Sequence, residues 1–281
     1  MHAARFKAGF GRWASRIFLL IVTVLTLYPV VWNLYSAFKT NTEFLGNPLA
    51  LPQGFAWDNF ERAWSKASIG VNFMNSVYGV VILLAVVIVC VIPCAYVLAR
   101  YRFFGSNAML GLFMAAVFIR ATYIMAPLFL QMNSLRLTEM VVPYAVLCAV
   151  TQFPFSIFLM TGFMRSIPRD FEEAAGIDGC GNFRILTQII APMAKPGIMT
   201  VCMLSAMAIW NEYPVALVML TRETNMTLPI GLARLYERQR YATDWGALFA
   251  ALMIVLIPTV IFYSIGQRYL IEGVSAGGVK G

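Results

Sequence analysis

Few residues of this sequence could carry chemistry, and several of them lie together between Phe171 and Pro192. The stretch FEEAAGIDGCGNFRILTQIIAP holds two adjacent glutamates, an aspartate, an arginine and three glycines. Catalysis by paired carboxylates would need a histidine, a metal cluster or a phosphate-binding loop beside them, and the stretch has none of these. Adjacent glutamates on a helix also point about 100° apart, so they do not converge on one substrate. We therefore expect neither a catalytic site nor a cofactor here.

The local sequence predicts a short helix, a tight turn and a second short helix. Asp170 is the expected N-cap, and Glu172 and Glu173 fall in the first turn, where the helix dipole favours carboxylates. Glycines end the first helix, and the second extends from Asn182 to Ile190, with one face formed by Phe183, Leu186 and Ile190. Two interpretations stay open: a solvated surface helix, or a docking helix whose alanines allow close approach while a glutamate supplies a charged contact.

Composition places this hairpin in a membrane protein. The chain of 281 residues is 60% hydrophobic and only 12% charged, against about 25% charged in soluble domains. A soluble protein with a very large core is the alternative, but the apolar residues form long unbroken runs. Five cysteines and the single histidine, His2, predict neither a disulfide framework nor a metal site. The net charge of +8 is explained by membrane topology and needs no nucleic-acid partner.

Six apolar segments are long enough to cross a bilayer as helices, which takes about 20 residues. We expect an all-α polytopic fold with spans at Ile17–Phe38, Phe73–Leu98, Ala108–Leu130, Val141–Phe163, Ile198–Leu220 and Gly246–Ile265. The first run follows a basic start and is too long for a cleavable signal, so it is expected to stay as a span. Lys and Arg are in excess at the termini and around Glu172, which predicts that these parts face the cytoplasm.

The hairpin resembles the EAA loop of bacterial ABC importer permeases. That pattern has Glu-Ala-Ala, three residues, Gly, nine residues, Ile, one residue and Leu-Pro. The chain matches its spacing with Glu173, Ala174, Ala175, Gly179, Ile189 and Pro192, and departs from it only at Ala191. "RSIPRDFEEAAGIDG", "WNEY", "TLPIGL", "TDWG" and the tail "GVSAGGVKG" are similar to the carbohydrate branch of the family, in particular to the shorter, six-span subunit of the maltose-type permease pair.

The resemblance implies the type I importer fold in one transmembrane permease domain spanning residues 1–281. It implies transport of a carbohydrate across the bacterial inner membrane, with a second permease subunit, two cytoplasmic ATPase subunits and an extracytoplasmic solute-binding protein as partners. ATP hydrolysis would take place on the ATPase, which would be contacted by a coupling loop at about 164–197. The coupling residues would be Glu172, Glu173, Ala174, Ala175, Gly179, Phe183, Ile189 and Pro192. An importer of a non-sugar solute, a secondary transporter and a non-transporting assembly factor are the alternatives.

Two charges lie inside predicted spans, where a charged side chain costs on the order of 2.5–3.5 kcal/mol. Arg120 and Glu212 are expected at similar depth, about 18–21 Å from the same end of their helices. We expect them to interact directly or through water. Glu212 lies in the stretch Trp210, Asn211, Glu212 and Tyr213, whose aromatic residues are of the kind that stack on sugar rings. These four residues and Arg120 either line the translocation path or simply help the helices to pack.

The last expectations concern an outer loop and the tail. The segment at about 221–245 is basic and aromatic, and Gly231 is expected to give it a flexible point. The resemblance implies that Gly231, Arg234 and Tyr236 contact the binding protein, with Arg240 and Tyr241 nearby; a solvated connector is the alternative. The tail Gly273–Gly281 is expected to be non-helical, and in the family such a tail reaches the ATPase subunits.

Overall fold

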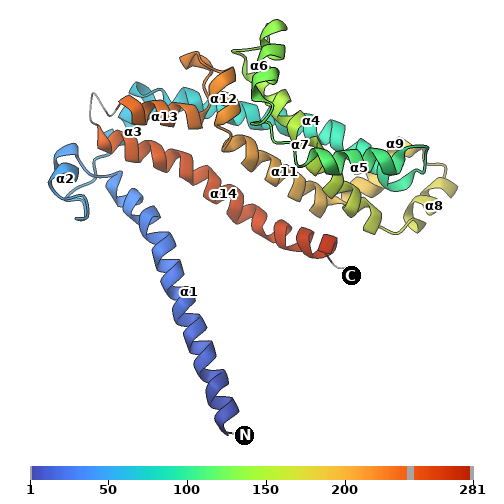
Figure 1. The fold of residues 1–281 in the computed structure, drawn as a ribbon, viewed down its shortest axis with the longest axis horizontal. Helices are drawn as coiled ribbons and strands as arrows, with labels where there is room; N and C mark the ends of the chain where they lie inside the picture. Colours follow the sequence, from blue (N-terminus) through green and yellow to red (C-terminus); the bar gives the residue numbers. More distant parts are fainter. Residues whose placement is uncertain (1, 239–243, 279–281) are drawn as a thin grey trace. The chain divides into compact units, whose positions relative to one another are not determined.

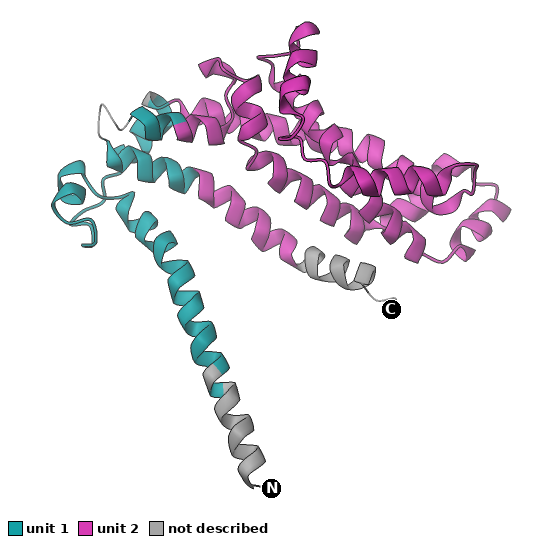
Figure 2. Cartoon of the chain, in the orientation of Figure 1, with its two compact units in different colours: residues 1–67, 234–254 teal, residues 68–233, 255–281 magenta. Residues whose placement is uncertain are grey.

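The computed structural model describes residues 2–238 and 244–278, and within these ranges every regular element is a helix. The predicted all-α class is therefore confirmed. The chain divides into two compact units, one formed by residues 1–67 and 234–254 and the other by residues 68–233 and 255–281 (Figure 2). We call them unit 1 and unit 2 and describe each by itself. The single permease domain that the sequence predicts stays a prediction.

Unit 1 packs around aromatic rings and one buried lysine. Its elements are α1 (His2–Ser36), α2 (Asn41–Gly46), α3 (Asp58–Glu61), the π-helical turn η1 (Arg62–Lys66) and the first part of α14 (Trp245–Gly278). Lys39 is buried and donates hydrogen bonds to the carbonyl oxygens of Asn47 and Pro48, at 3.3 and 2.9 Å. Burial lowers the pKa of Lys39, because removal from water disfavours the charged form. These bonds hold the loop after α2 against the end of α1.

Unit 2 is built on two long helices, α4 (Ile69–Arg100) and α7 (Val141–Ser166), which pack along each other with α11 (Lys195–Trp210) against both (Figure 1). Their shared core is aliphatic, with Leu83 of α4 and Met160 of α7 fully buried. The remaining elements are α5 (Ser106–Ala116), α6 (Met125–Ser134), α8 (Asp170–Ile177), α9 (Asn182–Ile185), η2 (Leu186–Ile190), α10 (Ala191–Met193), α12 (Pro214–Met219), η3 (Glu223–Asn225), much of α13 (Leu228–Arg238) and the rest of α14.

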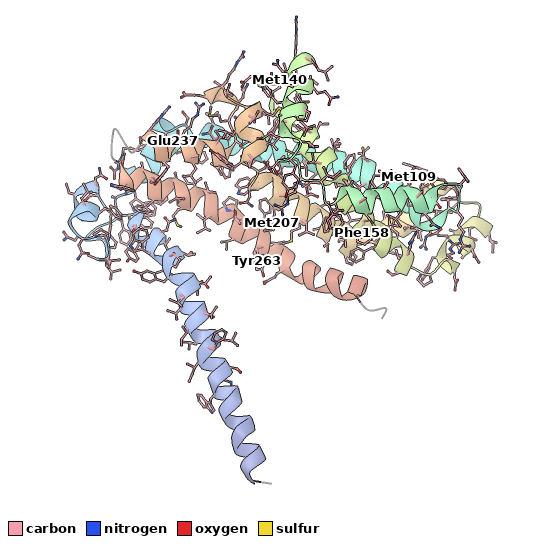
Figure 3. The ribbon with its side chains drawn as sticks, viewed as in Figure 1. Met109, Met140, Phe158, Met207, Glu237 and Tyr263 are labelled. Atoms are coloured by element: carbon pink, nitrogen blue, oxygen red, sulfur yellow. The ribbon has the colours of Figure 1, made fainter. Side chains whose placement is uncertain are left out.

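The outer surface of unit 2 is apolar. Met109 of α5, Phe158 of α7 and Tyr263 of α14 all expose their side chains (Figure 3). In water such a surface would be costly, whereas lipid tails cover it without loss. The surface therefore fits a protein embedded in a bilayer.

By length and composition, four described helices could cross a membrane, or up to six if each of two bent helix pairs is one span. The predicted span at Ala108–Leu130 is not one continuous helix, because α5 ends at Ala116 and the chain turns by 84° before α6. The predicted span at Ile198–Leu220 is also broken, since α11 ends at Trp210 and α12 begins at Pro214. A hydropathy average does not detect such breaks, because apolar residues continue through them.

The tail also differs from expectation. We expected Gly273–Gly281 to be non-helical, but α14 continues to Gly278. Extending an existing helix needs no new nucleus, so a long apolar helix can carry weak helix formers at its end. Residues 279–281 lie outside the described part of the chain.

Glu139 joins the start of α7 to the segment after α12. Its carboxylate accepts hydrogen bonds from the backbone N–H groups of Thr221 and Arg222, at 2.9 and 3.0 Å, and from the Thr221 hydroxyl. Burial by itself would raise the pKa of Glu139, but these donors outweigh it and the pKa is lowered. Glu139 therefore favours its charged form and fixes this connection at the end of unit 2.

Glycine allows close packing where α11 begins, and this leads to a prediction. A Cβ on Gly197 would lie 2.5 Å from the ring of Phe163, while a Cβ on Gly111 of α5 would meet nothing within 4 Å. Gly197→Ala should destabilise the protein by about 1–3 kcal/mol through overpacking. Gly111→Ala is the matched control and should be neutral or stabilising by up to about 1 kcal/mol. Thermal unfolding in detergent measures both, and equal effects would contradict the packing assignment.

Candidate functional site

The polar hairpin folds largely as its local sequence predicts. Helix α8 is followed by Gly179, whose φ of +77° lies in the left-handed region that glycine adopts without strain. The second arm runs through α9, η2 and α10 and then bends by 79° into α11. One detail differs from expectation: Asp170 is the first helical residue of α8 rather than its N-cap. The carbonyl oxygen of Arg169 accepts the N–H groups of Glu172 and Glu173, so Arg169 occupies the cap position.

The two adjacent glutamates face different ways, consistent with the separation of about 100° between successive residues on a helix. Glu172 points inward, and its Oε1 forms an ion pair at 2.5 Å with Nε of Arg100, the last residue of α4. The two side chains are only 16% and 6% exposed. Glu173 is exposed on the outer face. Only one of the two glutamates is thus free to contact another molecule.

Further bonds attach the hairpin to the end of α4. The Tyr96 hydroxyl donates to the other carboxylate oxygen of Glu172 at 3.4 Å. The guanidinium of Arg100 also donates to the carbonyl oxygen of Ile167 at 3.0 Å, and that of Arg169 donates to the carbonyl oxygen of Arg100 at 3.1 Å. A force on α8 would therefore act directly on α4.

The outward face of the hairpin is unusually apolar for a polar segment. Ile177 is 89% exposed and Phe183 is 79% exposed, with Phe171 and Ala174 also exposed. The predicted common face of Phe183, Leu186 and Ile190 is not formed, since Leu186 and Ile190 are buried whereas Phe183 is exposed. A π-helical stretch, η2, begins at Leu186, so the regular α-helical spacing that would place the three residues on one face is interrupted here.

The other predicted coupling residues lie on both sides of the hairpin. Gly179 and Pro192 are exposed, and Ile189 is half-buried. Ala175 is buried on the inner side of α8. The structure thus brings together an outer face of Glu173, Ala174, Ile177, Gly179 and Phe183. Ala175 and Glu172 instead hold that face in place from behind. Their role towards a partner stays a prediction.

A cavity of about 560 Å³ lies in unit 2 where the two broken spans meet, lined by both membrane charges. Arg120 belongs to the break between α5 and α6, and Glu212 to the break between α11 and α12. Among the described residues no ion pair joins them, so the expected direct contact is not formed. Glu212 instead accepts the N–H of Val215 at 2.9 Å and thereby caps the start of α12. Thr151 and Gln152 of α7, which we did not predict from the sequence, also line this cavity.

The aromatic residues beside Glu212 have different surroundings. Trp210 is 2% exposed and packs edge-on against Phe73 and Phe262, with ring centroids 5.6 and 6.0 Å away. It is a core residue in this structure and has no free face for a sugar ring. Asn211 is exposed and donates to the carbonyl oxygen of Met207, while Tyr213 is half-buried. Neither Asn211 nor Tyr213 is among the residues that line the cavity.

The predicted outer loop is partly helical. Gly231 lies within α13 and is buried, and a Cβ there would come within 1.9 Å of the Asn72 amide. The expectation of a flexible point at Gly231 is therefore wrong, because this glycine permits close packing of α13 on α4. Arg234 is half-buried and Tyr236 is exposed. Arg240 and Tyr241 lie outside the described residues.

A helical protein with an apolar exterior, broken spans around a polar-lined cavity and an anchored hairpin belongs to the class of multi-span membrane transport proteins. The model of the family described as "binding-protein-dependent transport system inner membrane component" matches residues 2–275, and the chain belongs to this family. Its fold is that of ABC importer permeases of type I.

Curated relatives and a solved structure agree with this assignment. The chain is 34% identical to the diacetylchitobiose uptake system permease protein NgcG of Streptomyces coelicolor, over 94% of this chain and 87% of that protein. It is 31% identical to the sulfoquinovosyl glycerol transport system permease protein SmoH of Agrobacterium fabrum, over 93% and 91%. A bacterial ABC transporter that imports the acidic polysaccharide alginate matches in fold, with a TM-score of 0.80 and 24% identity over 91% and 95%.

The buried ion pair yields a prediction with an internal control. Glu172→Gln leaves Arg100 charged, buried and without its carboxylate, a change that typically costs about 3–5 kcal/mol. Glu173→Gln, one residue along on the exposed face, should change stability by no more than about 0.5 kcal/mol. Thermal unfolding of the two variants in detergent separates them. If both variants lost the same stability, the inward orientation of Glu172 would be refuted.

A second prediction concerns the membrane charges. Without direct contact, Arg120→Leu and Glu212→Leu should have additive effects on stability, within about 0.3–0.5 kcal/mol. Glu212→Leu alone should cost about 1 kcal/mol because Val215 loses its cap. A double-mutant cycle in detergent provides the test. Recovery of stability in the double variant would instead reveal a water-mediated pair.

Proposed function

We propose that the chain is a permease subunit of an ATP-driven importer of a carbohydrate in the bacterial inner membrane. The family assignment supports the importer class, and the relatives named for diacetylchitobiose uptake and sulfoquinovosyl glycerol transport support a carbohydrate. A partner permease would complete the translocation path, and an extracytoplasmic binding protein would deliver the sugar. The exposed Tyr236 and the half-buried Arg234 would contact that binding protein. The chain itself would carry no catalytic site.

The main support for a coupling role is that the two sides of the hairpin differ. Its inner side is fixed to α4 by the Glu172–Arg100 ion pair, and its outer side presents Ile177 and Phe183 next to the charge of Glu173. Exposed apolar side chains beside one charge suit a groove on another protein better than they suit water. We infer that two cytoplasmic ATPase subunits drive the importer and that one of them receives this face. In this arrangement the hairpin and both termini face the cytoplasm.

The cavity lined by Arg120 and Glu212 is the candidate section of the translocation path in this subunit. Its walls combine an arginine, a carboxylate, threonines and a glutamine with aliphatic side chains. These polar side chains can donate hydrogen bonds to hydroxyl groups and accept hydrogen bonds from them, and this does not require a fixed binding pocket. An importer of a non-sugar solute and a secondary transporter remain the alternatives, and a secondary transporter would have no use for a docking face.

The test of coupling does not need the identity of the sugar. Phe183→Ser and Glu173→Lys should each reduce the ATPase that co-purifies with the detergent-extracted complex, since both change the docking face and leave the anchor intact. Gly179→Pro should do the same, because proline cannot adopt a φ of +77°. Leu135→Ser, which removes an exposed leucine after α6, is the matched control and should leave ATPase capture unchanged.

Two outcomes would contradict the proposal. Normal ATPase capture in all three hairpin variants would show that the hairpin does not dock. If a strain lacking this chain still grew on every oligosaccharide that supports the parent, and instead lost a non-sugar nutrient, the importer class would stand while the carbohydrate assignment would fall.

A further inference from the structure

A second cavity, of about 890 Å³, lies where α4 and α7 end and α5 begins. Four arginines line it: Arg100 and Arg102 from the end of α4 and the following loop, and Arg165 and Arg169 from the end of α7 and the approach to α8. No carboxylate is among its lining residues. We propose that this cavity binds the headgroup of an anionic phospholipid.

The charges of this arginine cavity are largely uncompensated. Arg100 is neutralised by Glu172. Arg165 and Arg169 donate to the backbone carbonyl oxygens of Leu98 and Arg100, at 3.3 and 3.1 Å, which uses a donor but cancels no charge. Arg102 is exposed and has no hydrogen bond or ion pair to the described part of the chain. Three positive charges therefore surround one cavity, and guanidinium groups bind phosphate oxygens through paired, charge-assisted hydrogen bonds.

The start of α5 adds to the attraction for an anion. Gly105, with a φ of +86°, turns the chain into α5, and Ser106 and Asn107 of its first turn line the same cavity. The N-terminal end of a helix carries a partial positive charge and unpaired N–H groups. This end contributes to the site, although the arginines define it.

The surroundings favour a lipid over a free anion. Tyr101 is exposed beside Arg102, together with Phe103 and Phe104. Tyrosine side chains are enriched at the boundary between the bilayer and water. The spans formed by α4 and α7 both end here, at Arg100 and Ser166, so the cavity lies at headgroup depth. Its volume also exceeds what an inorganic phosphate fills and suits a larger headgroup. Basic pockets between membrane helices are known sites for such headgroups.

The site would touch the hairpin anchor directly. Arg169 precedes α8, and its guanidinium already reaches the carbonyl oxygen of Arg100. A phosphate held between Arg102, Arg165 and Arg169 would join the ends of α4 and α7 to the start of α8. The bound lipid would then stabilise the same connection as the Glu172–Arg100 pair.

The test compares lipids on the full-length chain in detergent. Phosphatidylglycerol should raise the midpoint of thermal unfolding above that in phosphatidylcholine, and native mass spectrometry should show it retained. Arg102→Gln should weaken phosphatidylglycerol binding about fivefold, the equivalent of about 1 kcal/mol for each basic residue at an anionic surface. Arg102 has no partner among the described residues to lose, so this variant should fold normally. Adding Arg169→Gln should weaken binding further.

Arg184→Gln is the matched control, because Arg184 is an exposed arginine of the hairpin whose Nε donates to Gln188 instead of lining the cavity. It should bind phosphatidylglycerol as the parent does. Equal stabilisation by both lipids, or undiminished binding by Arg102→Gln and the double variant, would overturn the proposal. So would a matching shift produced by inorganic phosphate alone. If the arginine variants left lipid binding intact but reduced ATPase capture, the cavity would belong to a protein interface instead.

Discussion

The buried ion pair between Arg100 and Glu172 is the contact on which the rest of this end of the molecule depends. It joins the last residue of a long span to the first turn of a surface helix, two segments that are far apart in the sequence. A pair so little exposed is held at a high desolvation cost, which the Tyr96 hydroxyl and the carbonyl of Ile167 help to offset. Such a pair need not add net stability, but removal of either partner leaves a buried charge without compensation. The inner side of α8 is held by these contacts, whereas its outer side remains available to another molecule.

This division fits the proposed coupling role of the hairpin. A docking surface that moved independently of the membrane helices could not transmit a displacement to them. Here the backbone of the segment before α8 is also bonded to α4, through Arg100 to Ile167 and through Arg169 to Arg100. Rigid elements joined by several short contacts shift as packed bodies instead of deforming. The hairpin is therefore attached to the end of α4 by several contacts, as the transmission of a displacement requires.

The parts that the sequence predicted well are those decided by local chemistry. The helix–turn–helix of the hairpin follows from alanines, first-turn carboxylates and a glycine at positive φ, all within one short stretch. The rotation of each helix about its axis depends on distant partners, and there prediction failed. For Trp210 the sequence leaves open a place on the path or in helix packing, and the structure places it in the core between Phe73 and Phe262. Gly231, which the sequence suggests as a flexible point, packs against Asn72. The arginine cavity was missed for the same reason, because its members come from separate span ends.

Helix α1 differs from these packed segments. In its apolar segment, Ser15–Ser36, none of the 18 most hydrophobic consecutive residues is buried within the chain. Only its last turns contact the rest of unit 1, where Trp32 packs against Phe44 and Phe249. The exposed part of the helix before Trp32 needs no protein partner in lipid, since the backbone hydrogen bonds of a helix are satisfied internally. It can therefore enter the bilayer as soon as it leaves the ribosome. During synthesis α1 would fix the topology of the chain before any of the helices that enclose the cavities exist.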